Sequence, residues 1–131
     1  MTKYLLDTCV CISMFRNEGN VRETLQKVGV ENCYISEITV AELYFGLAKA
    51  ADKKRKQDDI REVQRLFRVI PAYSSFKEYG EIRQSLEHTG QRVDQFDLLI
   101  GATAIHHKLT LVTSNLKHFE RIEGLEIENW K

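Results

Sequence analysis

Short runs of apolar residues alternate with longer segments of helical periodicity along this chain. Short runs rich in aromatic and branched side chains are typical of buried strands, and they occur at residues 4–6, 33–35, 69–70, 109–112 and 125–127. Between them, apolar positions three or four apart predict helices over residues 9–15, 21–28, 37–50, 74–88 and 94–107. This alternation predicts an α/β fold with a mostly parallel sheet of about five strands and right-handed crossovers.

Polar residues beside these segments indicate where the helices begin. Asn20, Ser36, Ser74 and Asp94 or a neighbour each stand at the start of a predicted helix and are expected to act as N-caps. The helix over 37–50 is expected to bury much of its surface. The small residues in the helix over 94–107 indicate close packing against the sheet.

Length and charge limit the classes of protein that this chain can be. Its 131 residues are expected to form a single domain over residues 1–131. Lys plus Arg and Asp plus Glu both count 19, so the zero net charge gives no global argument for a nucleic-acid or membrane partner. The charge-dense segment 49–68 is either a solvated helix face with ion pairs such as Asp58 with Arg61 and Glu62 with Arg65, or a basic rim beside an RNA-binding cleft.

The three cysteines favour a reducing compartment. Cys9, Cys11 and Cys33 are odd in number and lack CxxC spacing, so core packing is the favoured interpretation, with metal or redox chemistry as the alternative. No apolar stretch is long enough for a signal peptide or a membrane span. We therefore expect a cytoplasmic protein with no membrane partner.

Three acids depart from apolar or small-residue surroundings. Asp7 ends the first predicted strand, Glu42 lies inside a helix, and Asp97 lies near the start of another helix. If they meet at about 4 Å, each pair repels by roughly 4 kcal/mol at an effective dielectric constant of 20. A divalent cation would relieve this repulsion, and Mg²⁺ prefers such oxygen ligands. The expectation is a single cation-binding pocket at the carboxyl ends of the strands.

Each acid also has a structural explanation. Asp97 could belong to a capping box that begins at Val93 or Asp94, Asp7 could form an Asx turn, and Glu42 could pair with a buried Lys or Arg. Asp94 is expected to cap the helix or to contact the metal ligands, rather than to bind the metal itself. The four histidines, His88, His106, His107 and His118, lack metal-ligand spacing with a partner acid, so no catalytic role is expected of them.

The motifs around these acids resemble those of the PIN-domain ribonucleases, and specifically the VapC-type toxins of bacterial type II toxin-antitoxin pairs. The matching segments, in order, are YLLDT (4–8), ISEITVAEL (35–43), DLLIGATA (97–104), LVTSN (111–115) with Phe119, and IEGLEIENW (122–130). Each segment is weak alone, but their ordered spacing is specific.

The resemblance implies a three-layer helix/sheet/helix fold and endonuclease activity on RNA that depends on Mg²⁺ or Mn²⁺. Asp7, Glu42 and Asp97 match the family's first three acids. The fourth position, often Asp, is Asn115, which is expected to orient a water molecule rather than bind the ion. Similar toxins cut structured RNA such as transfer RNA, form homodimers, and are neutralised by a cognate antitoxin that covers the site.

This hypothesis assigns metal-assisted hydrolysis of a phosphodiester to the acids, with Arg92, Lys108 and Lys117 as candidate phosphate contacts.

Two alternatives remain open. A receiver-type signalling domain would use Asp7 as a phosphate acceptor, although such a site needs adjacent acids and a late Lys. A catalytically inactive PIN domain would serve only as a binding module.

Overall fold

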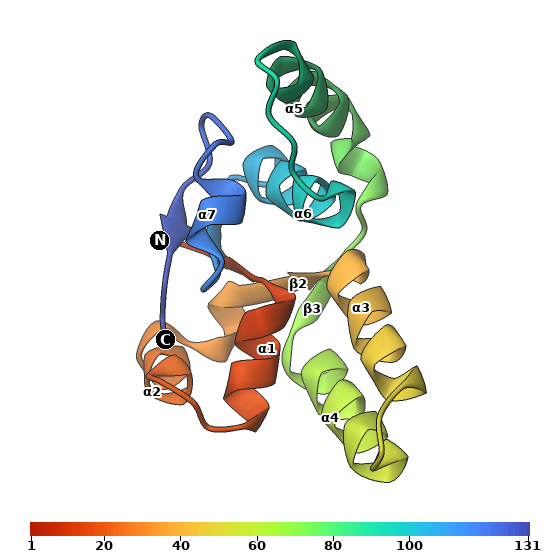
Figure 1. Cartoon of the computed structure of the whole chain (residues 1–131). Helices are drawn as coiled ribbons and strands as arrows, with labels where there is room; N and C mark the ends of the chain where they lie inside the picture. The colour runs from red at the N-terminus through yellow and green to blue at the C-terminus, as the bar shows by residue number, and fades with distance from the viewer.

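The computed structural model describes the whole chain, Met1–Lys131, and its elements follow the predicted alternation (Figure 1). In chain order they are β1 (Tyr4–Leu6), α1 (Thr8–Phe15), α2 (Val21–Val28), η1 (Val30–Asn32), β2 (Cys33–Ser36), α3 (Glu37–Ala48), α4 (Lys53–Leu66), β3 (Arg68–Ile70), η2 (Tyr73–Ser75), α5 (Phe76–His88), α6 (Gln95–His106), β4 (Thr110–Val112), α7 (Leu116–Phe119) and β5 (Ile127–Glu128). The prediction of an α/β fold is confirmed.

All five strands are parallel and form one sheet in the order β3-β2-β1-β4-β5. From β1 the chain adds β2 and β3 on one side of the sheet, and then it crosses over to add β4 and β5 on the other side of β1. The direction in which strands are added therefore reverses between β1 and β4. Open α/β sheets bind ligands at the carboxyl ends of the strands beside such a reversal. Receiver-type domains have the order 2-1-3-4-5 instead, so the topology contradicts that alternative.

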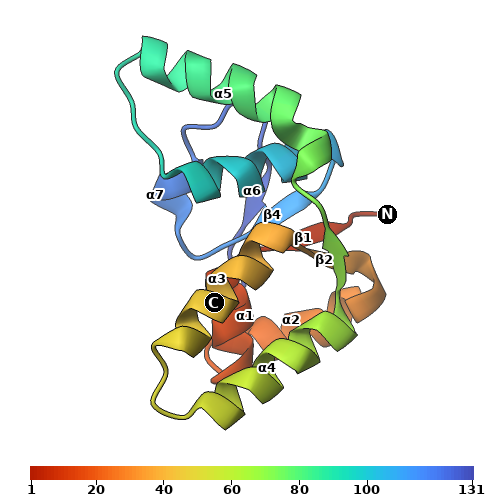
Figure 2. The ribbon, with the colours of Figure 1, turned by 90° about the vertical axis from the view of Figure 1, so that its right-hand side faces the viewer.

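Helices cover both faces of the sheet and make three layers, as expected (Figure 2). Successive strand residues point to opposite faces, so Leu6 and Val112 join a core with α1 to α4, whereas Leu5 and Leu111 join a core with α5 to α7. The small residues Gly101, Ala102 and Ala104 of α6 are buried, as close packing requires, and Ala104 belongs to the second core. None of the helices combines the length and apolar content that a membrane crossing requires.

Several element ends differ from the predictions. The fifth strand is Ile127–Glu128, because its register is set by pairing with β4. The short helices η2 and α7 were not predicted, and η2 moves the start of α5 to Phe76. Helix α3 was expected to be largely buried, but only Thr39 and Leu43 are buried on it, because its outer side faces solvent.

The predicted N-caps and ion pairs are confirmed in part. The Ser36 hydroxyl accepts the Ile38 N–H at 3.0 Å and caps α3, whereas the side chain of Asn20 makes no capping bond. Both predicted ion pairs on α4 are present, Asp58 with Arg61 at 3.8 Å and Glu62 with Arg65 at 2.6 Å. These pairs, with Ile60 and Val63 buried beneath, support the interpretation of α4 as a solvated helix face.

Candidate active site

Asp7 lies where β1 ends and α1 begins, with only 3% of its surface exposed. Its backbone N–H bonds to the Val112 carbonyl at 2.9 Å, which ties it to β4. One carboxylate oxygen, Oδ1, accepts the Thr8 N–H at 2.8 Å, and the other, Oδ2, accepts the Thr113 hydroxyl at 2.8 Å. The first of these bonds gives Asp7 a local turn role, but it is the Thr113 bond that fixes the carboxylate at the sheet edge.

Glu42 approaches the same edge from the second turn of α3. The Thr8 hydroxyl donates to Glu42 Oε1 at 2.6 Å and lies 3.2 Å from the Thr39 hydroxyl. Burial raises the pKa of Glu42, and the negative charges of Asp7, Asp97 and Asp94 raise it further, against the opposing effect of the Thr8 bond. No Lys or Arg pairs with Glu42, so the buried-ion-pair alternative is wrong.

Asp97 lies in the first turn of α6, where its Oδ2 is 3.0 Å from Nδ1 of His118. Burial raises the pKa of Asp97, and Asp7 raises it further. Asp94 occupies the N-cap position of α6 but makes no side-chain capping bond, so the capping box is absent. No spacing in the sequence linked His118 to a partner acid, and the contact forms across 21 residues because α7 places His118 beside α6.

The three predicted acids therefore influence one another's charge, and they come from the junction of β1 and α1, from α3 and from α6. No Lys or Arg lies within salt-bridge distance of any of them, and His118 is the one basic side chain that contacts the cluster, through Asp97. No three His, Cys, Asp or Glu side chains converge closely enough to coordinate one ion together. Mg²⁺ commonly uses one or two carboxylates and keeps several waters, so the donor set fits such an ion in chemistry and in charge.

Asn115, the fourth candidate residue, is exposed at the carboxyl end of β4, and its backbone N–H donates to Thr113 Oγ1 at 3.0 Å. Sequence reasoning missed Thr113, which is fully buried between Asp7 and Asn115. It could have been found by the rule that selected Asp7, since both residues directly follow strands that prove to be neighbours.

The cysteines differ from one another. Cys11 and Cys33 are buried in the core, as predicted. Cys9 is only partly buried and lies in the site, with Sγ 3.5 Å from Asp7 Oδ2 and 3.6 Å from Thr113 Oγ1. Cys9 packs against the first core, as predicted, and it also reaches the acids because α1 begins at the sheet edge.

Basic residues lie on one side of the acids. Arg92 and Lys117 line a cavity that also contains His118, the partner of Asp97. Lys108 precedes β4, so it lies at the amino edge of the sheet, opposite to the acids, and its predicted place near the site was wrong. A cavity of about 610 Å³ between α5 and the loop before α6 contains none of the three acids.

Comparison with known proteins gives the same family as the motifs. The PIN domain family model matches residues 4–125. Ribonuclease VapC2 of Rickettsia felis is 35% identical over 131 residues, which cover 97% of each chain. The tRNA(fMet)-specific endonuclease VapC of Shigella flexneri is 33% identical over 132 residues and 99% of each chain.

Solved structures agree with this assignment. The chain resembles one in the structure of VapBC2 from Rickettsia felis bound to a promoter DNA fragment, with a TM-score of 0.91, 32% identity, and coverage of 99% and 100% of the two chains. A chain of DNA-bound VapBC from Salmonella typhimurium also gives a TM-score of 0.91, at 31% identity over the full length of both chains. The chain therefore belongs to the PIN-domain family and, within it, to the VapC-type ribonuclease toxins.

Proposed function

We propose that this chain is an endoribonuclease that hydrolyses RNA phosphodiesters with a divalent cation, Mg²⁺ or Mn²⁺. The observation that carries the proposal is the gathering of Asp7, Glu42 and Asp97 at one edge of the sheet with no Lys or Arg to balance them. Such a cluster is costly unless a cation offsets the charge. Asp7 and Asp97 would hold the ion, and Glu42 would act through a water molecule or a second ion.

The bound ion supplies two effects, activation of the attacking water and neutralisation of charge on the phosphate in the transition state. The protein residues supply position. Thr113 and the Thr8 backbone hold both oxygens of Asp7, and the Thr8 hydroxyl holds Glu42. Asn115 lies just after the end of β4, two residues beyond Thr113, and its side-chain amide orients a water molecule without adding charge.

The proposed substrate is structured RNA such as transfer RNA. This specificity is supported by the relative named as a tRNA(fMet)-specific endonuclease, which matches nearly the whole chain. A cytoplasmic location belongs to the same proposal, since three free thiols are typical of a reducing compartment.

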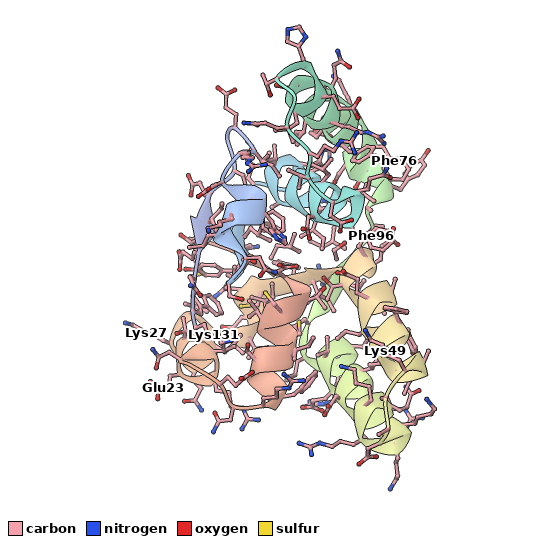
Figure 3. All side chains as sticks on the ribbon, in the orientation of Figure 1. Glu23, Lys27, Lys49, Phe76, Phe96 and Lys131 are labelled. Carbon is pink, nitrogen blue, oxygen red and sulfur yellow. The ribbon has the colours of Figure 1, made fainter.

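We also propose a cognate antitoxin and a homodimer. The antitoxin is supported by the similarity to chains of VapBC and toxin-antitoxin structures. The homodimer is supported by large exposed apolar side chains, which often mark protein interfaces. Phe76 and Phe96, 52% and 49% exposed, lie on the right-hand side in Figure 3, and Tyr73 packs against Phe76 with a centroid distance of 5.6 Å.

The decisive experiment compares Asp7→Asn with the wild type on transfer RNA and bulk RNA, with Mg²⁺, with Mn²⁺, and with EDTA. We expect the wild type to cleave only with a divalent ion and Asp7→Asn to be inactive while keeping its circular dichroism spectrum. Asp58→Asn, the same change on the solvated face of α4, serves as the control and should remain active. Divalent-dependent cleavage by Asp7→Asn would contradict the site assignment, and an inactive wild type would favour the binding-module alternative.

A further inference from the structure

A cavity of about 360 Å³ lies next to His118, the partner of Asp97, between the loop that precedes α6 and the region of α7. It is lined by Arg92, Val93, Asp94, Lys117, His118 and Arg121. The lining residues come from two segments of the chain, so the cavity depends on the tertiary fold.

This cavity concentrates positive charge that is not neutralised within the chain. Arg92, Lys117 and Arg121 make no ion pair, and Asp94 is the only acid in the lining. Arg65 and Arg83 form ion pairs with Glu62 and Glu87, but unpaired arginines such as Arg55 also occur elsewhere. The distinguishing feature is therefore that three unpaired cations gather around one cavity. In a chain with zero net charge, three free cations around one cavity are a local feature that favours an anionic ligand.

The cavity and the acid cluster share a wall. His118 lines the cavity and its Nδ1 lies 3.0 Å from Asp97 Oδ2. Asp94 also lines the cavity, and its charge contributes to raising the pKa of both Asp97 and Glu42. An anion in the cavity would therefore lie next to whatever group occupies the carboxylate site.

We propose that this cavity binds a backbone phosphate of the RNA, next to the phosphate that is cleaved. The inference rests on the proposed nuclease function and adds a phosphate subsite to it. Arginine offers paired N–H donors that match two phosphate oxygens, and lysine adds a mobile point charge. A polyanion that crosses an acidic site needs cations beside that site, and Arg92, Lys117 and Arg121 supply them. Such contacts fix the position of the strand without reading its sequence.

The basic run 53–56 at the start of α4 is the competing RNA contact. Lys53 is already used there, because its Nζ donates to the carbonyls of Leu47, Ala48 and Ala50 at the end of α3. In Figure 2 this end of α4 lies at the bottom of the molecule, whereas α6 and α7 lie above the middle. The cavity therefore has the better position, and the exposed pair Lys54 and Arg55 provides a matched control.

The test measures binding of a fluorescent single-stranded RNA in EDTA, over a range of salt concentrations. The double variant Arg92→Gln/Lys117→Gln and the control Lys54→Gln/Arg55→Gln each remove one Arg and one Lys. Each lost phosphate contact should lower the slope of log affinity against log salt by about 0.7. For the cavity variant we expect a slope lower by about 1.4 and binding roughly 25-fold weaker at 0.1 M salt, with little change for the control.

Equal effects of the two double variants would overturn the proposed subsite, even if the wild type cleaves RNA as proposed. Loss of antitoxin binding by the cavity variant, with RNA binding unchanged, would overturn it as well and assign the cavity to an acidic protein segment. Failure of the nuclease function is distinguishable, because it would appear as a wild type without divalent-dependent cleavage. A cavity variant that still cleaves but needs more RNA to reach half-maximal rate would support the subsite.

Discussion

The bond between Thr113 and Asp7 gives the sharpest test of how the candidate site is held. Thr113 is fully buried, and its hydroxyl donates to Asp7 Oδ2 at 2.8 Å while accepting the Asn115 N–H at 3.0 Å. The variant Thr113→Val keeps the shape of the side chain and removes the donor. A hydrogen bond to a charged group contributes about 1.5–3 kcal/mol net, so the free energy of unfolding should fall by about that amount.

Thr103→Val is the matched control. Thr103 is also fully buried, but its hydroxyl donates at 2.8 Å to the Leu99 carbonyl, a neutral acceptor one turn earlier in α6. Such a bond contributes about 0.5–1.5 kcal/mol, and back-bonding within a helix often contributes less. The two threonine variants should therefore differ by roughly 1 kcal/mol or more in the free energy of unfolding.

Urea denaturation followed by circular dichroism measures both variants, and thermal denaturation should give a Tm lower by about 6–12 °C for Thr113→Val, at about 4 °C for each kcal/mol. A double-mutant cycle that combines Thr113→Val with Asp7→Asn isolates the contribution of the negative charge of Asp7. With a neutral amide at position 7, the cost of Thr113→Val should drop to that of Thr103→Val. Equal costs for the two valine variants, or a cost that Asp7→Asn leaves unchanged, would refute the argument.

Four further outcomes follow from the same geometry. Mg²⁺ should raise the Tm of the wild type and have little effect on Asp7→Asn, as differential scanning fluorimetry would measure. Because the pKa of Glu42 is raised in the folded chain, its proton stabilises the fold below the ordinary Glu pKa, and this stability is lost as pH rises through the raised value. Glu42→Gln should therefore lose less stability than the wild type over that interval in urea titrations. Asn115→Asp should keep cleavage and strengthen Mg²⁺ binding in calorimetry, and a loss as deep as that of Asp7→Asn would contradict the role given to Asn115. Gly101→Ala should change the free energy of unfolding in urea by less than about 1 kcal/mol, because the new Cβ would lie 2.9 Å from the movable Cδ1 end of Ile122, whose displacement opposes a gain in helix propensity of about 1 kcal/mol.

The acids of the candidate site could be selected from the sequence because each has apolar or small neighbours along the chain. A carboxylate directly after an apolar strand, or inside a helix among apolar residues, needs a reason, and that requirement pointed to Asp7 and Glu42. Hydrophobic alternation also predicted the parallel sheet, because it is a local property of the chain. The order of the strands was not predicted, since it depends on which edges meet in the folded molecule.

The residues that were missed depend on that order. Thr113 became visible as a partner of Asp7 only when β1 and β4 proved to be neighbours in register. His118 meets Asp97 across 21 residues through the four-residue helix α7, which is too short to have a periodic pattern. Lys108 was misplaced because strand direction decides which edge of the sheet a flanking residue occupies.

The hydrogen bonds that hold the acids support the proposed binding of a cation. Hydroxyl and backbone N–H donors satisfy the oxygens of Asp7 and Glu42 without cancelling their charge. A Lys or Arg in the same place would stabilise the free protein more, but a metal ion would then have to displace it. The free cations lie instead in the neighbouring cavity, where they face an incoming anion rather than the carboxylates. Under the proposed function, this separation of acidic and basic side chains would let one edge of the sheet attract a cation and a polyanion at adjacent positions.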